Sequence, residues 1–184
     1  MTAFDWAFPI VYDEEKGLVD HPRDPGGITN HGISLRFALG VGDLNGDGKP
    51  DLDVDGDGDV DADDIRKLTR EQAADVYRHY FWRPLRCEEM PCGLALMVFD
   101  TGVNQGRGPA ITLLQEALGV KADGKIGPVT IAAIQKCDPI RTLKDFTAHR
   151  MVRYATTKNF DAFGLGWMRR AVRIHDAAMG AEVH

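Results

Sequence analysis

Two carboxylates and a hydroxyl near the N-terminus have a spacing that suits acid–base chemistry. Glu15 and Asp24 stand nine residues apart, and Thr29 follows five residues later in a segment rich in glycine and proline. Glu15 ends a predicted helix, where the carbonyl end of the helix dipole and burial against apolar residues both favour a neutral carboxylic acid. Asp24 on the facing loop can stay ionised, and Thr29 can orient a water molecule or contact a sugar. A neutral acid together with an ionised carboxylate is the pair that hydrolyses glycosidic bonds.

The residues alone leave alternatives to this assignment. Asp13 and Glu14 compete with Glu15 for the role of the acid, and an isolated glutamate near a helix end is most often a surface residue. Asp24 precedes Pro25 and could simply begin a turn. Spacing by itself does not decide between these interpretations.

A second group of carboxylates forms the acidic segment, residues 43–64, which holds ten aspartates and one lysine. Asp53, Asp55 and Asp57 fall at positions 1, 3 and 5 of an EF-hand loop, a glycine follows at the sharp turn, and Asp64 takes position 12. Oxygen ligands at alternating positions can curl around one hard cation. The pattern therefore predicts a calcium site, and the alternative is a solvated acidic loop that holds no ion.

The stretch just upstream repeats the beginning of this pattern. Its position 12 is Val54, which cannot ligate, so a first ion would borrow Asp53 or Asp55. We therefore expect one or two Ca²⁺ ions within an inserted loop at residues 40–66. The candidate ligands of the two overlapping sites are Asp43, Asn45, Asp47, Lys49, Asp51, Asp53, Asp55, Asp57, Asp59 and Asp64.

The charge of the chain is uneven. The net charge is −6, but the acidic segment alone carries −9, which leaves about +3 for the rest. A mildly basic body suits an anionic polymer as partner, and we expect no nucleic-acid partner. The six histidines show no zinc-ligand spacing, which disfavours a zinc-dependent amidase.

The sequence also shows no pattern that predicts disulfide bonds, a secretion signal or a membrane span. The three cysteines, Cys87, Cys92 and Cys137, form no even disulfide framework, so we expect them reduced, as in a protein made in the cytoplasm. The N-terminal residues show no basic and apolar signal pattern, and no apolar run is long enough to span a membrane.

Helical periodicity dominates the elements that must position these groups. An apolar face through Phe4, Phe8 and Val11 predicts a first helix that reaches Glu15. Thr69 and Gln72 form a capping-box pattern that predicts a helix extending to residue 82. The only strand signal is a small β element near residues 17–34. Five further helices are expected at Leu94–Gln105, Pro109–Leu118, Pro128–Cys137, Ile140–Thr157 and Gly166–Met179.

Several segments together resemble one known family. The run E-x-G-x-V-x-x-P-x-D-P-G-G-x-T-N-x-G-I-S, which starts at Glu15, resembles the active-site signature of glycoside hydrolase family 108. These are N-acetylmuramidases, among them phage endolysins and secretion activators. The likeness continues in LTREQAADVYRHYFW, in LALMVFDTGVNQGRGPAITLLQEALGV, in DGKIGPVTIAAI, and in the aromatic-Gly-x-Gly-Trp stretch Phe163–Trp167. It covers nearly the whole chain except the inserted loop.

The resemblance implies roles for the first motif. The glutamate that opens the motif, Glu15 in this chain, is the proposed catalytic acid of the family. Phage lysozymes more broadly show Glu-x8-Asp-x5-Thr, which Glu15 and Asp24 match, whereas Thr29 comes one residue early and Asn30 stands at the expected place. Lys16 replaces the first glycine of the usual Glu-Gly-Gly, so this chain departs from the family pattern directly after the acid.

The resemblance also implies a substrate groove. Asp100 and Asn104 are four residues apart on one face of a helix that would line it. Asn30, Tyr80 and Trp82 are further candidates for contact with sugar rings. The alternative for the helix is a buried position with two satisfied polar groups, and for the aromatic residues a place in the core.

These observations predict a single lysozyme-like domain, residues 1–184, with a C-terminal helical lobe of peptidoglycan-binding type at 92–184. We expect a monomer that cleaves between N-acetylmuramic acid and N-acetylglucosamine in glycan strands, by an inverting course. An enzyme of phage-endolysin type would be made in the cytoplasm and reach the periplasmic wall with outside help, such as a holin. The alternatives are a non-catalytic peptidoglycan-binding protein and a calcium-dependent interaction module of dockerin type.

Overall fold

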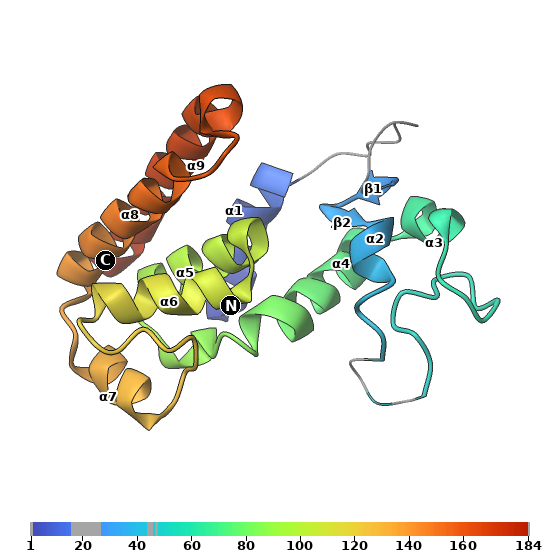
Figure 1. Ribbon diagram of the computed structural model, residues 1–184. Coiled ribbons are helices and arrows are strands. Elements are labelled where there is room, and N and C mark those ends of the chain that lie inside the picture. The colour runs from blue at the N-terminus through green and yellow to red at the C-terminus, as the bar shows by residue number, and fades with distance from the viewer. Residues whose placement is uncertain (1, 16–26, 44–45, 47, 184) are drawn as a thin grey trace. The chain divides into compact units, whose positions relative to one another are not determined.

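The computed structural model describes residues 2–15, 27–43, 46 and 48–183. Among them helices predominate, and one pair of two-residue strands is the only sheet, which confirms the expected α-rich class (Figure 1). The chain divides into two compact units: Met1–Ala7 with Phe81–His184 forms the first, and Phe8–Tyr80 forms the second. No helix in the described ranges is long and apolar enough to cross a membrane.

The second unit begins inside helix α1, Ala3–Glu15, which ends where the sequence predicts. Phe8 and Val11 are buried, as expected for the apolar face of an amphipathic helix. Pro9 lies within α1 and does not end it. Glu15 therefore occupies the last helical position, at the carbonyl end of the helix dipole.

A minimal β-hairpin follows, with strand β1 at Thr29–Asn30 and strand β2 at Ile33–Ser34 in antiparallel pairing. The two residues between the strands, His31 and Gly32, both have positive φ, at 51° and 76°. Positive φ at both central residues is the signature of a type I′ turn, whose twist matches a two-residue hairpin. The small β element is thus confirmed within the predicted region, and the short helix α2, Leu35–Ala38, continues directly from it.

Two capping boxes define the helices that close this unit. Thr69 opens helix α4, Arg70–Val76: its hydroxyl accepts the N–H of Gln72 at 3.2 Å, and the Gln72 side chain accepts the N–H of Thr69 at 2.9 Å. This is the capping box that the sequence predicts. The helix then continues into a π-helical stretch, η1, at Tyr77–Trp82.

The second capping box was not predicted. Asp61 and Asp64 open helix α3, Ala62–Lys67, inside the region expected to be a loop. A helix of six residues is too short to show an apolar period, so hydrophobic spacing could not predict it. What fixes α3 is the reciprocal pairing of the two aspartate side chains with backbone N–H groups at its start.

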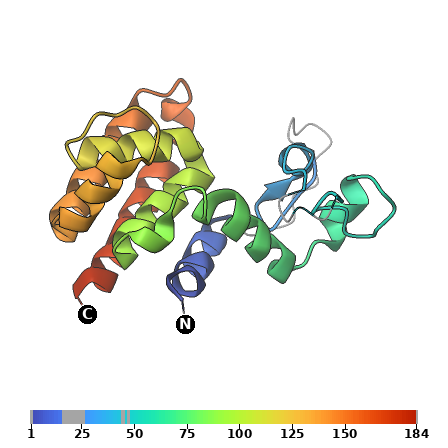
Figure 2. The same ribbon diagram turned by 90° about the horizontal axis from the view of Figure 1, so that it is seen from below.

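The first unit is a helical assembly around α5 (Figures 1 and 2). Residues 93–102 of α5 are all buried, and α6, α8 and α9 pack against this helix. Phe4, Trp82 and Phe99 form a cluster of ring contacts beside it, with centroids 5.3–5.9 Å apart. The elements of this unit are η2 (Cys87–Glu89), α5 (Cys92–Gln105), α6 (Arg107–Ala117), α7 (Pro128–Lys136), α8 (Pro139–Ala155) and α9 (Phe160–Val183).

All five helices expected in this unit are present, but α9 starts six residues earlier than predicted. Gly164 and Gly166 both lie inside the helix. Gly164 is buried, and a Cβ there would stand 2.7 Å from ring atoms of Phe160. This glycine therefore permits close packing of the first turn and does not end the helix.

The centre of the first unit contains a buried ionic network. Asp100 is fully buried, and its Oδ2 lies 2.5 Å from Nη2 of Arg150 while its Oδ1 accepts Nη2 of Arg170 at 2.7 Å. The hydroxyl of Tyr154 accepts N–H groups of Arg150 at 2.9 and 3.2 Å and donates to Oδ1 of Asn104 at 2.6 Å. One carboxylate thus joins α5 to both α8 and α9.

We expect the Asp100→Ala substitution to destabilise the protein by about 3–5 kcal/mol, because it leaves two buried guanidinium groups without their counter-charge. Asp145→Ala is the matched control, since Asp145 is half-buried at the protein surface and, among the described residues, forms its ion pair with Arg141 at 3.6 Å. Its cost should stay below about 1 kcal/mol. Denaturant unfolding followed by circular dichroism measures both, and equal losses would contradict the structural role of Asp100.

Candidate active site

The side chain of Glu15 packs against the turn of the hairpin. A Cβ added to Gly32 would stand 2.7 Å from Cβ of Glu15 and 2.3 Å from the hydroxyl of Tyr77. Only a glycine fits there, for lack of space and because its φ is +76°. The Tyr77 hydroxyl also donates to the carbonyl of His31 at 3.3 Å. Glu15, one of the three candidate acids, is therefore in contact with the hairpin.

An aromatic group surrounds the same turn. The Tyr12 hydroxyl lies 2.5 Å from Nδ1 of His31, and the two rings stack with centroids 5.6 Å apart. The guanidinium carbon of Arg70 lies 4.9 Å from the Tyr12 ring centroid and 5.8 Å from that of Phe8. Tyr12, His31 and Tyr77 were not predicted as site residues. The left-handed turn at His31 is the feature that brings them together.

The other candidates of the first motif are placed as follows. Thr29 lies in β1 and is half-buried. The amide nitrogen of Asn30 donates to the carbonyl of Ile65 at 3.0 Å, so this side chain ties the hairpin to α3. Asp24 lies outside the described residues. Asp13 is exposed, and Glu14 is half-buried.

The acidic segment contains a structural repeat with a shift of ten residues. The Asp43 carboxylate accepts the N–H groups of Gly46 and Gly48 at 2.6 and 2.7 Å, and the Asp53 carboxylate accepts those of Gly56 and Gly58 at 2.8 and 3.1 Å. All four glycines have positive φ, between 79° and 102°. At both expected loop starts the aspartate thus accepts N–H groups from glycines three and five residues later.

Six aspartates of the acidic segment gather into two groups of three. Carboxylate oxygens of Asp53, Asp55 and Asp57 lie within 4.8 Å of one another, and so do those of Asp59, Asp61 and Asp64. Asp61 was not among the predicted ligands. Asn45 and Asp47 lie outside the described residues, and the others, Asp43, Lys49 and Asp51, belong to neither group.

Asp64, expected at position 12 of the loop, is buried and serves the backbone. Its Oδ1 accepts the N–H of Val54 at 2.7 Å and that of Asp55 at 3.1 Å, and its Oδ2 accepts the N–H of Asp61 at 2.7 Å. These bonds hold the start of α3 against the loop. Asp64 is therefore not in one cluster with the ligands expected at positions 1, 3 and 5.

Charge in the acidic segment is only partly compensated. Nζ of Lys67 lies 2.7 Å from Oδ2 of Asp55, and this hydrogen bond lowers the pKa of Asp55 and raises that of Lys67. The charge of Asp57, followed by desolvation and further aspartates, raises the pKa of Asp59. Repulsion of this kind is relieved when a cation enters.

The remaining substrate candidates differ in their access to solvent. Tyr80 is half-buried, with its ring edge-on to that of Phe37 at 4.8 Å. Trp82 and Asp100 are fully buried, so in this structure neither offers an exposed atom to a sugar. Their places are the aromatic cluster and the ionic network described above. Asn104 is half-buried and keeps access to solvent.

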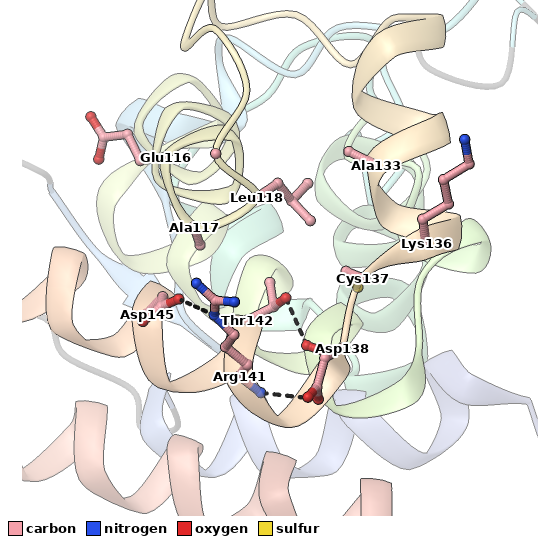
Figure 3. A pocket seen from close by; sticks show the side chains of 11 residues that line it. Glu116, Ala117, Leu118, Ala133, Lys136, Cys137, Asp138, Arg141, Thr142 and Asp145 are labelled. Atoms are coloured by element: carbon pink, nitrogen blue, oxygen red, sulfur yellow. Dashed lines mark hydrogen bonds and ion pairs between the residues drawn. The ribbon is translucent and has the colours of Figure 1, made fainter.

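One cavity of about 510 Å³ lies among α6, α7 and α8 (Figure 3). Several of the charged groups that line it pair with others: Arg141 with Asp145 at 3.6 Å, and Glu116 with His149 at 3.7 Å. The Asp138 side chain accepts N–H groups at the start of α8. None of the residues expected in the active site lines this cavity.

Comparison with known proteins gives two family matches and a similar structure. Residues 8–106 match the family model "Glycosyl hydrolase 108", and residues 109–172 match "Predicted Peptidoglycan domain". The solved structure of SagA from Brucella abortus is similar, with 31% identity and a TM-score of 0.78, over 96% of this chain and 94% of that one. No curated protein matches the chain.

We expect Gly32→Ala to lower the free energy of unfolding more than Gly119→Ala does. Gly119 has a similar φ of +68°, but a Cβ there would meet nothing within 4 Å, so it isolates the backbone strain of about 1 kcal/mol or more. Gly32→Ala adds the displacement of Glu15 and Tyr77. Thermal and denaturant unfolding measure the loss of unfolding free energy in the two variants. Equal losses would show that Glu15 and Tyr77 leave room for a Cβ at the turn.

Proposed function

The chain belongs to the glycosyl hydrolase 108 family and is a peptidoglycan hydrolase, and we propose that Glu15 is its catalytic acid. Glu15 protonates the oxygen of the bond between N-acetylmuramic acid and N-acetylglucosamine. Asp24, ionised, then positions water or stabilises the positive charge that develops on the sugar, and Thr29 orients the water. We expect the anomeric configuration to be inverted.

The observation that carries this proposal is the contact between Glu15 and the hairpin turn at Gly32. It lies within the matched residues 8–106 and sets Glu15 beside the element that carries Thr29. Glu15 lies at a helix C-terminus, half-buried against a tyrosine and a glycine turn. Asp13, exposed to solvent, lacks this environment.

The geometry of the acidic segment supports a second proposal, that the segment binds Ca²⁺. Its residues fit a hard cation: two groups of three carboxylates have converging oxygens, and glycines with positive φ let the chain curl at each loop start. Asp53, Asp55 and Asp57 would hold the ion, with Lys67 displaced from Asp55. When bound, Ca²⁺ supplies neutralising charge and no part of the hydrolysis.

A calcium ion in this segment would act on the hairpin through α3. Asp64 fastens the loop backbone to the start of α3, and the next residue, Ile65, accepts the Asn30 side chain of β1 through its carbonyl. Order in the loop is thereby transmitted to the strand that holds Thr29. We therefore propose that calcium stabilises the active site as well as the loop.

The biological setting is also a proposal. An endolysin of phage type, monomeric and delivered to the periplasmic wall with the help of a holin, fits an enzyme that cuts peptidoglycan. Membership of a hydrolase family argues against a calcium-dependent interaction module. Loss of turbidity of purified cell walls separates an active enzyme from a non-catalytic binding protein.

Glu15→Gln should reduce peptidoglycan hydrolysis by roughly 10²-fold or more while the fold is kept, because the amide has no acidic proton to donate. Glu14→Gln is the matched control, one residue away in the same helix, and should retain activity. Turbidity loss and mass spectrometry of the released muropeptides measure the rate and identify the bond. An active Glu15→Gln with an inactive Glu14→Gln would assign the acid to Glu14.

We expect chelation to lower the melting temperature and added calcium, more than magnesium, to restore it. A bound ion stabilises the folded state by RT ln(1+[L]/Kd), or about 2.7 kcal/mol at a hundredfold excess over Kd. Magnesium keeps its waters and suits a flexible carboxylate site poorly. The double variant Asp55→Asn, Asp57→Asn should lose most of this response.

Asp63→Asn is the control for this experiment. Asp63 is exposed in the same segment and pairs with Arg66 at 2.6 Å, outside both carboxylate groups. It should keep the full calcium response. Unfolding curves that do not change with chelator, in the wild type as in the variants, would mean that the acidic segment is solvated without an ion.

A further inference from the structure

We propose that Phe163, Trp167 and Asn104 lie along one subsite that holds a stretch of the glycan strand, with a saccharide ring stacked on the aromatic side chains. This inference rests on the proposed function. It assigns sugar binding to residues that take no part in the acid–base chemistry. All three residues lie in the first unit, on α5 and α9. Three properties of their arrangement carry the inference: an exposed aromatic surface, a fixed amide donor and an open space beside them.

The aromatic surface starts at Tyr154 and extends outward along α9. The rings of Tyr154 and Trp167 stack with centroids 5.3 Å apart at 19°, and Phe163 lies one turn before Trp167, 6.0 Å away at 33°. Trp167 is half-buried, whereas Phe163 is 58% exposed. An exposed ring braced by a half-buried one is a flat apolar surface held in one orientation.

The single hydroxyl proton of Tyr154 determines the orientation of the Asn104 side-chain amide. The Tyr154 hydroxyl accepts two N–H groups of Arg150, so its own single proton must go to the atom that faces it on Asn104. That atom is therefore the acceptor, Oδ1, at 2.6 Å. The amide nitrogen of Asn104 points away from Tyr154, and it has no hydrogen-bond partner among the described residues.

The surface around the rings is left uncovered. Gly166 lies three residues after Phe163, and a Cβ there would meet nothing within 4 Å. Gly164 is where the Phe160 ring packs, which keeps that ring close to the backbone. The space beside Gly166 is therefore open, and the helix continues through both glycines.

A saccharide ring matches these features better than a stem peptide does. Its C–H face stacks on an aromatic ring, and its hydroxyl and N-acetyl carbonyl oxygens accept amide protons. The subsite has no charged group among its three members, whereas the stem peptides of peptidoglycan carry carboxylates and an amine. The structure thus points to the glycan and not to the peptide as the part recognised here.

The test measures binding in the Glu15→Gln background, which keeps the ligand intact. The probes are insoluble peptidoglycan and glycan strands freed of their peptides by an amidase. Phe163→Ala should weaken binding to both by about tenfold, the scale of one lost aromatic contact. Asn104→Asp, which keeps the acceptor for Tyr154 and removes the donor, should weaken binding to a similar extent without lowering the melting temperature.

Leu165→Ala is the matched control, because Leu165 is 67% exposed on the same helix, and it should bind as the Glu15→Gln parent does. Equal binding by Phe163→Ala and Leu165→Ala, or a loss seen with intact peptidoglycan only, would overturn the saccharide subsite. Muropeptides released during the assay would show instead that Glu15→Gln is still active. That result contradicts the catalytic proposal, and the binding comparison is then read on strands too short to be cut.

Discussion

The buried carboxylate of Asp100 is the constraint on which the helical unit depends. A charge with no access to water is tolerated only where counter-charges meet it, and here they come from Arg150 on α8 and Arg170 on α9. The three helices must therefore dock in one register. The same guanidinium group fixes the Tyr154 hydroxyl, and that hydroxyl fixes Asn104. A requirement of the core thus determines which atom of a surface amide faces outward.

The unit that carries Glu15 depends on a different interaction, the close packing of side chains against the backbone of the hairpin turn at Gly32. Its sheet has only two residues in each strand, and too few backbone bonds to hold an active site rigid. The hairpin is braced from outside instead. The Glu15 side chain and the Tyr77 hydroxyl pack against Gly32, and the Asn30 side chain donates a hydrogen bond to the carbonyl of Ile65 in α3.

Sequence reasoning predicted the features that depend on local patterns. The Thr69 capping box, the end of α1 and the five later helices follow from side-chain periodicity and caps. It missed α3, which is too short for a period. For Asp100 it left open a sugar groove, implied by the resemblance, and a buried, satisfied position, because a helical stripe does not reveal which polar group is buried. That distinction depends on Arg150 and Arg170, fifty and seventy residues away.

The contact between Lys67 and Asp55 has a consequence for how the acidic segment meets metal ions. An ammonium group on the same chain cannot diffuse away, so its effective concentration at the carboxylate is on the order of millimolar whatever the solution contains. Any free cation has to compete with this tethered one. A Ca²⁺ ion bound as proposed above would therefore have to displace Lys67 from Asp55, which would lower the apparent affinity of the segment for calcium.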